Sequence, residues 1–589
     1  MTVHETGSGS VSSNVGGIEC GNTCAASIAS GTSVTLTPTA VSGNVFSGWS
    51  GACSGSGACT VAMNSAQSVT ATFTASVSQG SGAWPPPVQL STATSCVTTA
   101  ISAPAGSTTY NVGPGKTYTS LTSVPWLSLK AGDVVNIYYQ PTPYATIIAM
   151  TVTATAAAPV IINGVTDANC NRPILTGANA VVASDAVASN YWGQSPGAYL
   201  VGLGLINFAW APNGPYPYPI ASYINIQNLE ITGTATGQHY TNASGASASW
   251  SASYGIYAVM FSHVNIENCL IHGNDGGVFF NSQDAPRTSS YVTLRGNTIY
   301  GNGRVGSYLE HNIYGQGYRT LYEGNWLGAE MDGAIGSTLK DRSSGTVIRN
   351  NYIVASQRAI DLVDSETDPT VIDDALYNYA WVYGNVIVDD FAVPGQGSGD
   401  LIHWGGDSTI YANYRVGTLY FYFNTVIVQN ITSTSTQVGL FDMPLSSETV
   451  EAHSNVFYFE NNAATYWPIS LGICCGTINF DDANWVSTGY VTQNSNNGTG
   501  LVFHQNGTLL TGTSPLLNTN FTLSSSSGSP VIGRGVLAPT SVPSSAVNLA
   551  NLQPSAQYGT TASTQTSAGG NPSIVARGTV TDLGAYAAQ

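Results

Sequence analysis

The sequence predicts an all-β protein: a right-handed parallel β-helix, which is a single-stranded solenoid, with a small β module at its N-terminus. Three observations support this fold class. Charged residues make up only 8% of the 589 residues, whereas 43% are hydrophobic and 65 are glycine. A short motif centred on asparagine recurs between residues 228 and 455. Four of the nine cysteines fall within the first 60 residues, which is typical of a small disulfide-containing module.

The composition also excludes several classes of protein. Disordered chains have high charge and few aromatic residues, whereas this chain has 32 tyrosines and 11 tryptophans. The run of about 20 apolar residues that a membrane span requires is absent. Only 14 lysines and arginines oppose 31 acidic residues, which gives a net charge of −17. So few scattered cations cannot neutralise a nucleic-acid backbone, and we expect neither a membrane span nor a nucleic-acid partner.

Cysteine usage and composition indicate a secreted or cell-surface protein. The four N-terminal cysteines are expected to form disulfides rather than a zinc site, because no histidine lies between Cys20 and Cys59. The odd total leaves at least one free thiol, most simply Cys269 in an apolar run. The start Met-Thr-Val-His-Glu lacks the basic and then apolar residues of a signal peptide, so we expect Met1 to follow a removed signal.

The N-terminal module is expected at residues 14–76, after a disordered start at residues 1–13. Residues 33–38 and 68–73 alternate polar and apolar side chains, which predicts short strands. The order G-I-x-C, G-T-x-V-T-L-T, F-x-G-W-S-G-x-C and V-T-A-T-F resembles the internalin-type bacterial surface repeat. That resemblance implies a small β module at the edge of a secreted protein, without chemistry of its own.

Residues 77–107 form a predicted linker rich in proline, glycine and serine, and residues 108–589 form the predicted β-helix. In each repeat of the motif, the asparagine follows a short polar or aromatic pair and leads into apolar residues. Successive asparagines are 40, 29, 28, 26, 34, 39 and 31 residues apart. One coil of a parallel β-helix takes about 20–30 residues, so longer steps indicate inserted loops. The asparagines are Asn228, Asn268, Asn297, Asn325, Asn351, Asn385, Asn424 and Asn455.

Asparagine suits the tight bend between two strands of a coil. It tolerates a left-handed backbone and can stack on its equivalents in neighbouring coils. A β-propeller would instead carry Trp-Asp or Gly-His markers in each blade, and the sequence has none. The repeat therefore favours the solenoid.

Both ends of the predicted β-helix resemble known caps. Residues 112–118, Val-Gly-Pro-Gly-Lys-Thr-Tyr, resemble the N-terminal cap of secreted pectin- and alginate-lyase-type β-helix proteins, which places the cap at residues 108–180. Residues 527–535 and 582–586 resemble closing strands of the same superfamily, expected within residues 521–589. A solenoid needs such caps because its open ends would expose the edges of strands.

Four polar residues are predicted to form a column on one outer face of the β-helix. Their apolar neighbours, which we expect to point into the coil, are Ile313, Leu339, Ile360 and Ile402. Side chains alternate along a strand and coils stack about 4.8 Å apart, so the outward-facing residues would lie one above another. They are Tyr314, Lys340, Asp361 and His403. A register slip of one residue would turn all four inward.

A second resemblance is to secreted β-helix proteins related to alginate-lyase and chondroitinase-B-type polysaccharide lyases. It rests on His311-Asn-Ile-Tyr314, Glu323-Gly-Asn325, Leu339-Lys340-x-Arg342-Ser343 and Ile348-Arg-Asn-Asn-Tyr-Ile353. In such lyases a lysine is the base, an arginine about one coil further on assists, and calcium neutralises the uronate carboxylate. Lys340 matches the lyase lysine, whereas the arginine position reads Ile-Asp-Leu-Val-Asp-Ser over residues 360–365.

β-Elimination needs a base, a cation that stabilises the enolate-like intermediate, and an acid. The predicted catalytic residues are Lys340, Arg342, Tyr314, His403 and Asp361. The predicted substrate-binding residues are His311, Arg349, Arg358 and Trp404. Carboxylates are ligands that Ca²⁺ prefers, so a calcium site is predicted at Asp361, Asp364 and Glu366, with a solvated acidic loop as the alternative. Lys340 could instead form only a structural ion pair with Asp361 on the next coil.

These observations lead to two hypotheses. The first is a secreted carbohydrate-active enzyme, a polysaccharide lyase that acts on an extracellular polysaccharide such as a polyuronate. The second is a non-catalytic adhesin, fibre subunit or glycan-binding scaffold. A hydrolase would need paired carboxylates, and the candidate acidic pairs include Asp361 with Asp364, Asp373-Asp374, Asp389-Asp390 and Asp481-Asp482.

Overall fold

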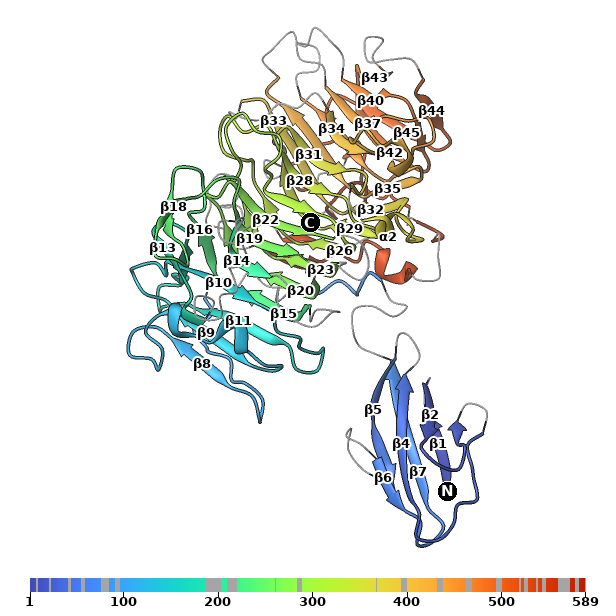
Figure 1. Ribbon diagram of the computed structural model, residues 1–589. Coiled ribbons are helices and arrows are strands. Elements are labelled where there is room, and N and C mark those ends of the chain that lie inside the picture. Colours follow the sequence, from blue (N-terminus) through green and yellow to red (C-terminus); the bar gives the residue numbers. More distant parts are fainter. Residues whose placement is uncertain are drawn as a thin grey trace. The chain divides into compact units, whose positions relative to one another are not determined.

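The computed structural model divides the chain into two compact units, Met1–Pro86 with Val542–Asn551, and Pro87–Ser541 with Leu552–Gln589 (Figure 1). The described residues are 1–6, 9–20, 23–40, 44–53, 59–75, 84–90, 96–185, 203–208, 220–259, 261–282, 289–366, 368–392, 400–431, 438–460, 469–493, 500–518, 521–523, 528–536, 539–542, 547–559, 572–577 and 582–587. Among them, no helix is long and apolar enough to span a membrane. Their short helices are η1 (Leu121–Ser123), η2 (Trp126–Ser128), α2 (Pro369–Ile372), η3 (Tyr411–Asn413) and η5 (Leu549–Leu552).

The first unit contains a module of two small β-sheets. One sheet has the order β1 (Thr2–Thr6), β7 (Ser68–Ala75) and β5 (Asn44–Gly51). The other has the order β3 (Glu19–Cys20), β2 (Gly9–Ser13), β4 (Ser33–Ala40) and β6 (Cys59–Ala62). Disulfides join Cys20 to Cys24 and Cys53 to Cys59, so the four N-terminal cysteines form disulfides as expected, in a pairing that the sequence leaves open.

The expectation that residues 1–13 are disordered is wrong. Val3 in β1 and Val11 in β2 are only 1% and 0% exposed, and both belong to the core of the module. Each valine alternates with polar neighbours, as in a strand with one buried face. Strands β1 and β2 therefore belong to the module.

The second unit is a β-helix in which three parallel sheets, here sheets A, B and C, enclose one apolar core (Figure 1). Each complete coil contributes one strand to sheet A, then one to sheet B and one to sheet C. Sheet A has the order β18 (Ser247–Ser249), β17 (His239–Thr241), β13 (Ala180–Val182), β10 (Thr146–Met150), β14 (Gly204–Phe208), β19 (Tyr254–Val259), β22 (Gly276–Asn281), β25 (Ile313–Gly315), β28 (Ser337–Asp341), β31 (Arg358–Leu362), β34 (Asp400–Trp404), β37 (Gly439–Met443), β40 (Ser470–Cys474) and β43 (Val491–Gln493). Among these described strands, only β18 is antiparallel to its neighbour.

Sheets B and C follow the same coil order. Sheet B has the order β44 (Val502–Gln505), β41 (Thr477–Phe480), β38 (Thr449–His453), β35 (Thr418–Tyr422), β32 (Tyr379–Tyr383), β29 (Thr346–Arg349), β26 (Tyr318–Glu323), β23 (Ser290–Arg295), β20 (Phe261–Glu267), β15 (Ala221–Gln227), β11 (Val160–Val165), β9 (Val134–Tyr138) and β8 (Thr109–Val112). Sheet C has the order β12 (Ile174–Thr176), β16 (Glu230–Thr232), β21 (Leu270–Ile271), β24 (Thr298–Ile299), β27 (Trp326–Leu327), β30 (Tyr352–Val354), β33 (Val386–Asp390), β36 (Thr425–Gln429), β39 (Val456–Phe459), β42 (Asn484–Ser487) and β45 (Leu509–Gly512).

The recurring asparagine forms a buried ladder at the bend between sheets B and C. Oδ1 of Asn351 accepts from the backbone N–H of Asn325 at 2.8 Å and from its Nδ2 at 2.9 Å. Nδ2 of Asn351 donates to the carbonyl of Tyr322 and to Oδ1 of Asn385, both at 2.9 Å. The same contacts link Asn297, Asn325, Asn351, Asn385, Asn424, Asn455 and Asn484. The ladder confirms the solenoid predicted from the repeat.

The left-handed residue of this bend is the one before the ladder asparagine. Gly296, Gly324 and Gly384 have φ of +62°, +63° and +66°. In the two earlier coils, Asn228 and Asn268 themselves have φ of +64° and +50°, so they occupy the glycine position of the bend. The repeat therefore contains two kinds of asparagine: one that adopts the left-handed backbone and one that forms the ladder.

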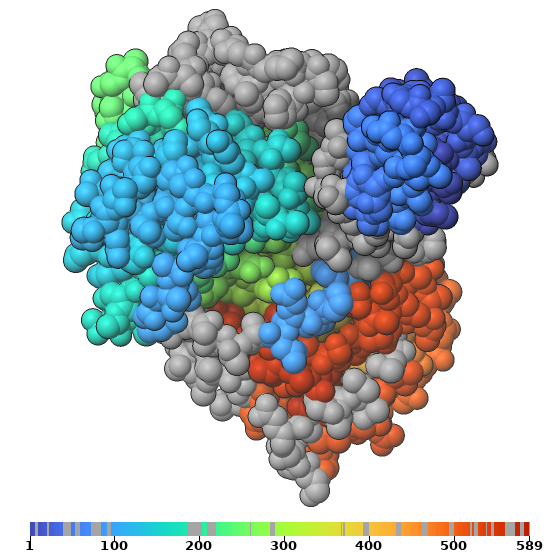
Figure 2. Space-filling model, turned by 90° about the horizontal axis from the view of Figure 1, so that it is seen from below, coloured from blue at the N-terminus to red at the C-terminus, as the bar shows by residue number. Residues whose placement is uncertain are grey.

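Residues 108–180 form the N-terminal end of the β-helix, where Trp126 and Leu121 are fully buried. Figure 2 looks at this end, with these residues in light blue to cyan. A disulfide joins Cys96, which precedes the first strand, to Cys170. Cys269 is a buried free thiol as predicted, and Cys474 and Cys475 are also free.

The expectation that residues 521–589 form closing strands is wrong for the described part of that segment. It contains one antiparallel hairpin, β46 (Ala556–Gly559) and β47 (Ser573–Ala576). Residues 542–551 belong to the first unit, and several other described residues, among them Leu523 and Val531, pack on the outside of sheet C. Leu583, Ala585 and Tyr586 cover outward-facing side chains of that sheet, among them Val386 and Ile427. Strands β33 and β36 are apolar on both faces, so their outer face needs a cover.

Removal of a ladder amide is expected to destabilise the solenoid strongly. Asn351→Ala leaves the N–H groups of Asn325 and the carbonyl of Tyr322 without partners in a buried bend. Each buried group without a partner costs about 1–3 kcal/mol, so the free energy of unfolding should fall by about 3 kcal/mol or more. Urea unfolding measures the change. The exposed Asn506→Ala is the matched control, and an Asn351→Ala midpoint equal to that of this control would contradict the account.

Candidate active site

The four residues of the predicted column lie side by side on the outer face of sheet A. The strand register pairs Tyr314 with Lys340, Lys340 with Asp361, and Asp361 with His403. Their neighbours Ile313, Leu339, Ile360 and Ile402 are fully buried in the coil. The predicted register of these strands is therefore confirmed.

The column continues at both ends. Towards the N-terminus, Tyr314 follows Phe279 and Tyr257 on the preceding strands, and towards the C-terminus His403 pairs with Asp442. The rings of Tyr257 and Phe279 are parallel, with centroids 4.8 Å apart, and the rings of Phe279 and Tyr314 are 5.1 Å apart. These rings cover one another's faces, so the stack leaves edges rather than faces for a sugar to meet.

Lys340 forms ion pairs with two carboxylates. Its Nζ lies 2.8 Å from Oδ2 of Asp361 and also contacts Oδ2 of Asp407. Burial alone lowers the pKa of Lys340, but the carboxylates of Asp361 and Asp407 outweigh burial and raise it. Lys340 therefore stays an ammonium at neutral pH and cannot accept a proton.

Asp407 is a site residue that the sequence analysis missed. It comes from the loop after β34 and lies between Lys340 and Arg342, whose Nη2 is 2.9 Å from Oδ1 of Asp407. Asp364 holds this loop, because its Oδ1 accepts from the backbone N–H of Asp407 at 2.9 Å. Burial raises the pKa of Asp407, but Lys340 and Arg342 outweigh burial and lower it, so Asp407 is ionised.

His403 and Asp442 form the C-terminal part of the site. Nδ1 of His403 lies 2.9 Å from Oδ1 of Asp361, and its Nε2 lies 4.0 Å from Oδ2 of Asp442. Arg358 contacts Asp400 and lies 3.6 Å from Asp442. Burial raises the pKa of Asp442; His403 and Arg358 lower it, Asp400 raises it, and the net shift is upward.

Two cations of the site are buried, whereas two of its carboxyl groups are partly exposed to solvent. The side chains of Lys340 and Arg342 are 9% and 4% exposed, whereas those of Asp407 and Asp442 are 26% and 21% exposed. Three cations, Lys340, Arg342 and Arg358, face six carboxyl groups: Asp361, Asp364, Glu366, Asp400, Asp407 and Asp442. The face is thus rich in carboxyl groups and poor in free positive charge.

The predicted substrate-binding residues separate into two groups. Arg358 lies on the same face as the column and is half-buried. His311 is buried, and its Nδ1 accepts a hydrogen bond from the backbone N–H of Ser337 at 2.8 Å. Burial and then Lys340 lower the pKa of His311 to about 3, so it is neutral. The prediction is wrong for Arg349 and Trp404, because both are fully buried.

Arg349 and Trp404 have structural partners instead. Arg349 is in sheet B, where Nε lies 2.7 Å from Glu323 and Nη1 lies 3.2 Å from the hydroxyl of Tyr383. Trp404 donates its Nε1–H to the carbonyl of Gly417 at 3.3 Å. Neither side chain can reach a substrate on sheet A.

The predicted calcium ligands do not form a cation cage. Asp361 already binds Lys340 and His403, and Asp364 accepts from the backbone and side chain of Ser408. Glu366 is paired with Arg342 at 2.9 Å. Among the described residues, these three carboxylates are not one of the groups whose ligand atoms lie within 4.8 Å of one another. The set does not fit calcium.

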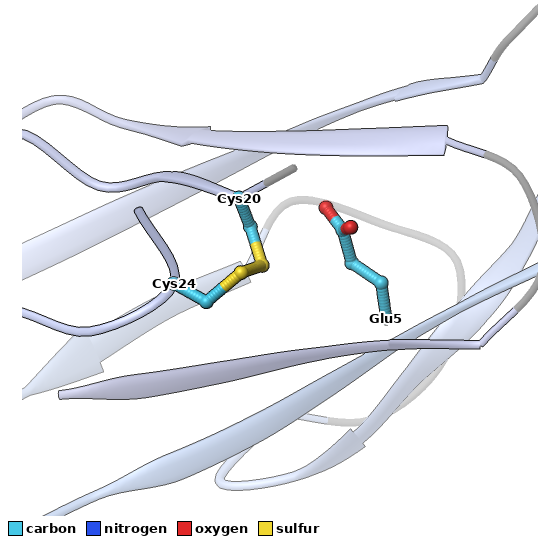
Figure 3. A group of neighbouring side chains, drawn as sticks. All are labelled: Glu5, Cys20 and Cys24. Atoms are coloured by element: carbon cyan, nitrogen blue, oxygen red, sulfur yellow. A yellow bond between two sulfur atoms is a disulfide. The ribbon is translucent and has the colours of Figure 1, made fainter. Parts of the chain in front are cut away.

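A second possible metal group lies in the first unit and is excluded by its chemistry. Figure 3 shows Glu5 beside Cys20 and Cys24, and the two sulfur atoms are bonded to each other. A disulfide offers no thiolate, and the thiolate is the metal ligand. The result agrees with the predicted disulfides.

Two family models match this chain, one in each of its two parts. The family model described as the divergent InlB B-repeat domain matches residues 1–77, and the model described as the right handed beta helix region matches residues 221–388. No curated protein matches the chain.

Three solved structures are similar to this chain at low identity. Pectate lyase Pel9A has 11% identity and a TM-score of 0.41, over 84% of this chain and 99% of its own. The GH136 lacto-N-biosidase from Eubacterium ramulus has 11% identity and a TM-score of 0.36, over 69% and 68%. The alginate lyase from Paenibacillus sp. str. FPU-7 has 14% identity and a TM-score of 0.33, over 69% and 98%.

Neutralising Asp361 is expected to destabilise the β-helix most at neutral pH. Burial raises the pKa of Asp361, but Lys340 and His403 outweigh burial and hold it well below 3.8. Its ionic stabilisation is therefore present above that pH and is lost as the pH falls through the folded-state pKa. Asp361→Asn should cost about 3 kcal/mol at pH 7, because it leaves a buried lysine short of a partner.

Thermal unfolding from about pH 7 down to about pH 2 tests this expectation. The difference in Tm between wild type and Asp361→Asn should become smaller as the pH falls. The exposed variant Asp332→Asn should have the Tm of wild type at every pH. A gap that is constant with pH would show that the ion pairs are not its cause.

We conclude that the chain carries a divergent InlB B-repeat domain at its N-terminus, followed by a right-handed β-helix. This conclusion rests on the family matches at residues 1–77 and 221–388 and on the three parallel sheets that enclose one core.

Proposed function

We propose that this protein is a secreted polysaccharide-cleaving enzyme whose active site is the outer face of sheet A from Tyr314 to Asp442. We further propose that it cleaves by hydrolysis, with Asp442 as the general acid and Asp407 as the general base or nucleophile. The observation that carries this proposal is a pair of partly exposed carboxyl groups with opposite pKa shifts on one face. Such a pair is the usual acid and base of glycoside hydrolysis.

The residues beneath the face account for the two roles. Lys340 and Arg342 keep Asp407 ionised, so that it can attack or activate water. Burial and the neighbouring Asp400 raise the pKa of Asp442, which suits a general acid that protonates the leaving glycosidic oxygen. Asp361 links Lys340 to His403 and so fixes both halves of the site. Asp361 and His403 are positioning residues in this proposal.

β-Elimination from a polyuronate is the second candidate, and one observation favours it. Lys340 and Arg342 converge on a single carboxylate, that of Asp407, and could bind a substrate carboxylate in the same way. Asp407 would have to leave this position, and Lys340 as an ammonium could not be the base. The excess of carboxyl groups also repels a polyanion, and calcium would be needed to offset that repulsion. Hydrolysis requires neither the displacement of Asp407 nor a bound calcium ion.

Variants of Asp407 distinguish the two chemistries. Wild type is assayed on a panel of neutral and acidic polysaccharides, with new reducing ends and the absorbance of an unsaturated product as readouts. Hydrolysis predicts that Asp407→Asn and Asp442→Asn each lower kcat by about 100-fold or more. Elimination predicts that Asp407→Asn frees the cation pair and raises activity on polyuronates, with an unsaturated product that EDTA abolishes.

The control for this experiment is Asp332→Asn, which removes an exposed carboxylate from the segment between β27 and β28. It should retain wild-type kcat and KM. Glycan binding without turnover on any polymer would contradict the proposal and would support a non-catalytic adhesin or scaffold.

The pH profile tests the assignment of Asp442. Activity should fall as the pH rises through the pKa of Asp442, because the acid must be protonated. Asp400→Asn removes a neighbouring negative charge that helps to raise this pKa, so the alkaline limb of kcat/KM should shift to lower pH. The acidic limb, set by Asp407, should not move. An alkaline limb unchanged in Asp400→Asn would contradict the role of Asp442.

A further inference from the structure

A second cluster of charged side chains lies on the outer face of sheet B, near the C-terminal end of the β-helix. Glu451 of β38 pairs in register with Asn479 of β41, which pairs with His504 of β44. His453 ends β38, and Asp481 follows the last residue of β41. The cluster therefore joins successive coils on a different sheet from the site of Asp407.

Glu451, His453 and Asp481 can act together as ligands. Each offers one ligand atom, and the three atoms lie within 4.8 Å of one another. The carboxyl groups of Glu451 and Asp481 therefore lie close together, with an oxygen of each within 4.8 Å of the other. Two ionised carboxylates at this distance repel each other, and a bound cation would remove that repulsion.

The side chains around the three ligands suit a metal ion. Nδ1 of His453 lies 3.3 Å from Oδ2 of Asp482, the kind of carboxylate partner that orients a metal-binding imidazole. Asn479 donates to Oε1 of Glu451 at 2.8 Å, while its own Oδ1 is buried and accepts no hydrogen bond within the described residues. Asn479 thus helps to position the carboxylate of Glu451.

We propose that Glu451, His453 and Asp481 bind a divalent transition-metal ion of the Zn²⁺ type. Imidazole nitrogen combined with carboxylate oxygen suits Zn²⁺, whereas Ca²⁺ and Mg²⁺ take oxygen ligands alone. All three residues are half-buried, so an ion can reach them from solvent. The ion would join the coil of β38 to the coil of β41 and stabilise the end of the solenoid.

Titration of the full chain with ZnCl₂ in a calorimeter tests the site. One zinc ion should bind, and Glu451→Gln and His453→Gln should each weaken binding by at least about ten-fold. Asp482→Asn should weaken it by about 10–100-fold through the orientation of His453. Zinc should also raise the Tm of wild type by more than that of His453→Gln at the same zinc concentration, because the stabilisation grows with the affinity of the folded state for the ion.

The matched control is His272→Gln. His272 also lies beside a carboxylate, Glu230 at 3.2 Å, but no third ligand joins them in a group within the described residues. This variant should bind zinc as wild type does. The proposal is overturned if zinc does not bind saturably, if both Glu451→Gln and His453→Gln bind it as tightly as wild type, or if CaCl₂ binds as tightly as ZnCl₂.

Discussion

The asparagine ladder between sheets B and C is the interaction on which the rest of the structure depends. Each buried amide accepts two hydrogen bonds from the coil before it and donates to that coil and to the next, as Asn351 does with Asn325, Tyr322 and Asn385. A coil shifted by one residue would leave these groups without partners in a dry bend. The ladder therefore fixes the register of every coil from Asn297 to Asn484. The alignment of Tyr314, Lys340, Asp361 and His403 on sheet A follows from that register.

A fixed register places charges close together that would otherwise be separated. Lys340 and Arg342 are nearly buried, and a buried cation is costly unless carboxylates or other acceptors compensate for the lost water. Asp361 supplies one carboxylate from the next coil, and Asp407 supplies another from a loop. The same pairing holds Asp407 in its ionised form at the surface. Structural stability and the proposed chemistry thus depend on the same ion pairs.

The sequence predicts the parts of this arrangement that are periodic. Alternation along a strand and the spacing of the asparagines were enough to predict which residues face outward, and the pairing of Lys340 with Asp361 was one of the two alternatives. Asp407 could not be predicted, because it belongs to a Gly-Gly-Asp-Ser loop without periodicity, and only the backbone contacts with Asp364 place it. Arg349 was assigned to the wrong face because the residue type alone does not reveal that it lies in sheet B rather than in sheet A. The C-terminal segment was misplaced because apolar runs such as Val386-Ile-Val388 show that a cover is needed but not which segment provides it.

The central claim is that the outer face of sheet A cleaves a polysaccharide by hydrolysis. The most direct test is to let wild type degrade a responsive polysaccharide in water labelled with heavy oxygen and to analyse the products by mass spectrometry. Hydrolysis transfers one oxygen from water to each new reducing end, so the account predicts labelled, saturated products. Unlabelled products that contain a new carbon–carbon double bond would contradict it, because elimination takes no oxygen from water.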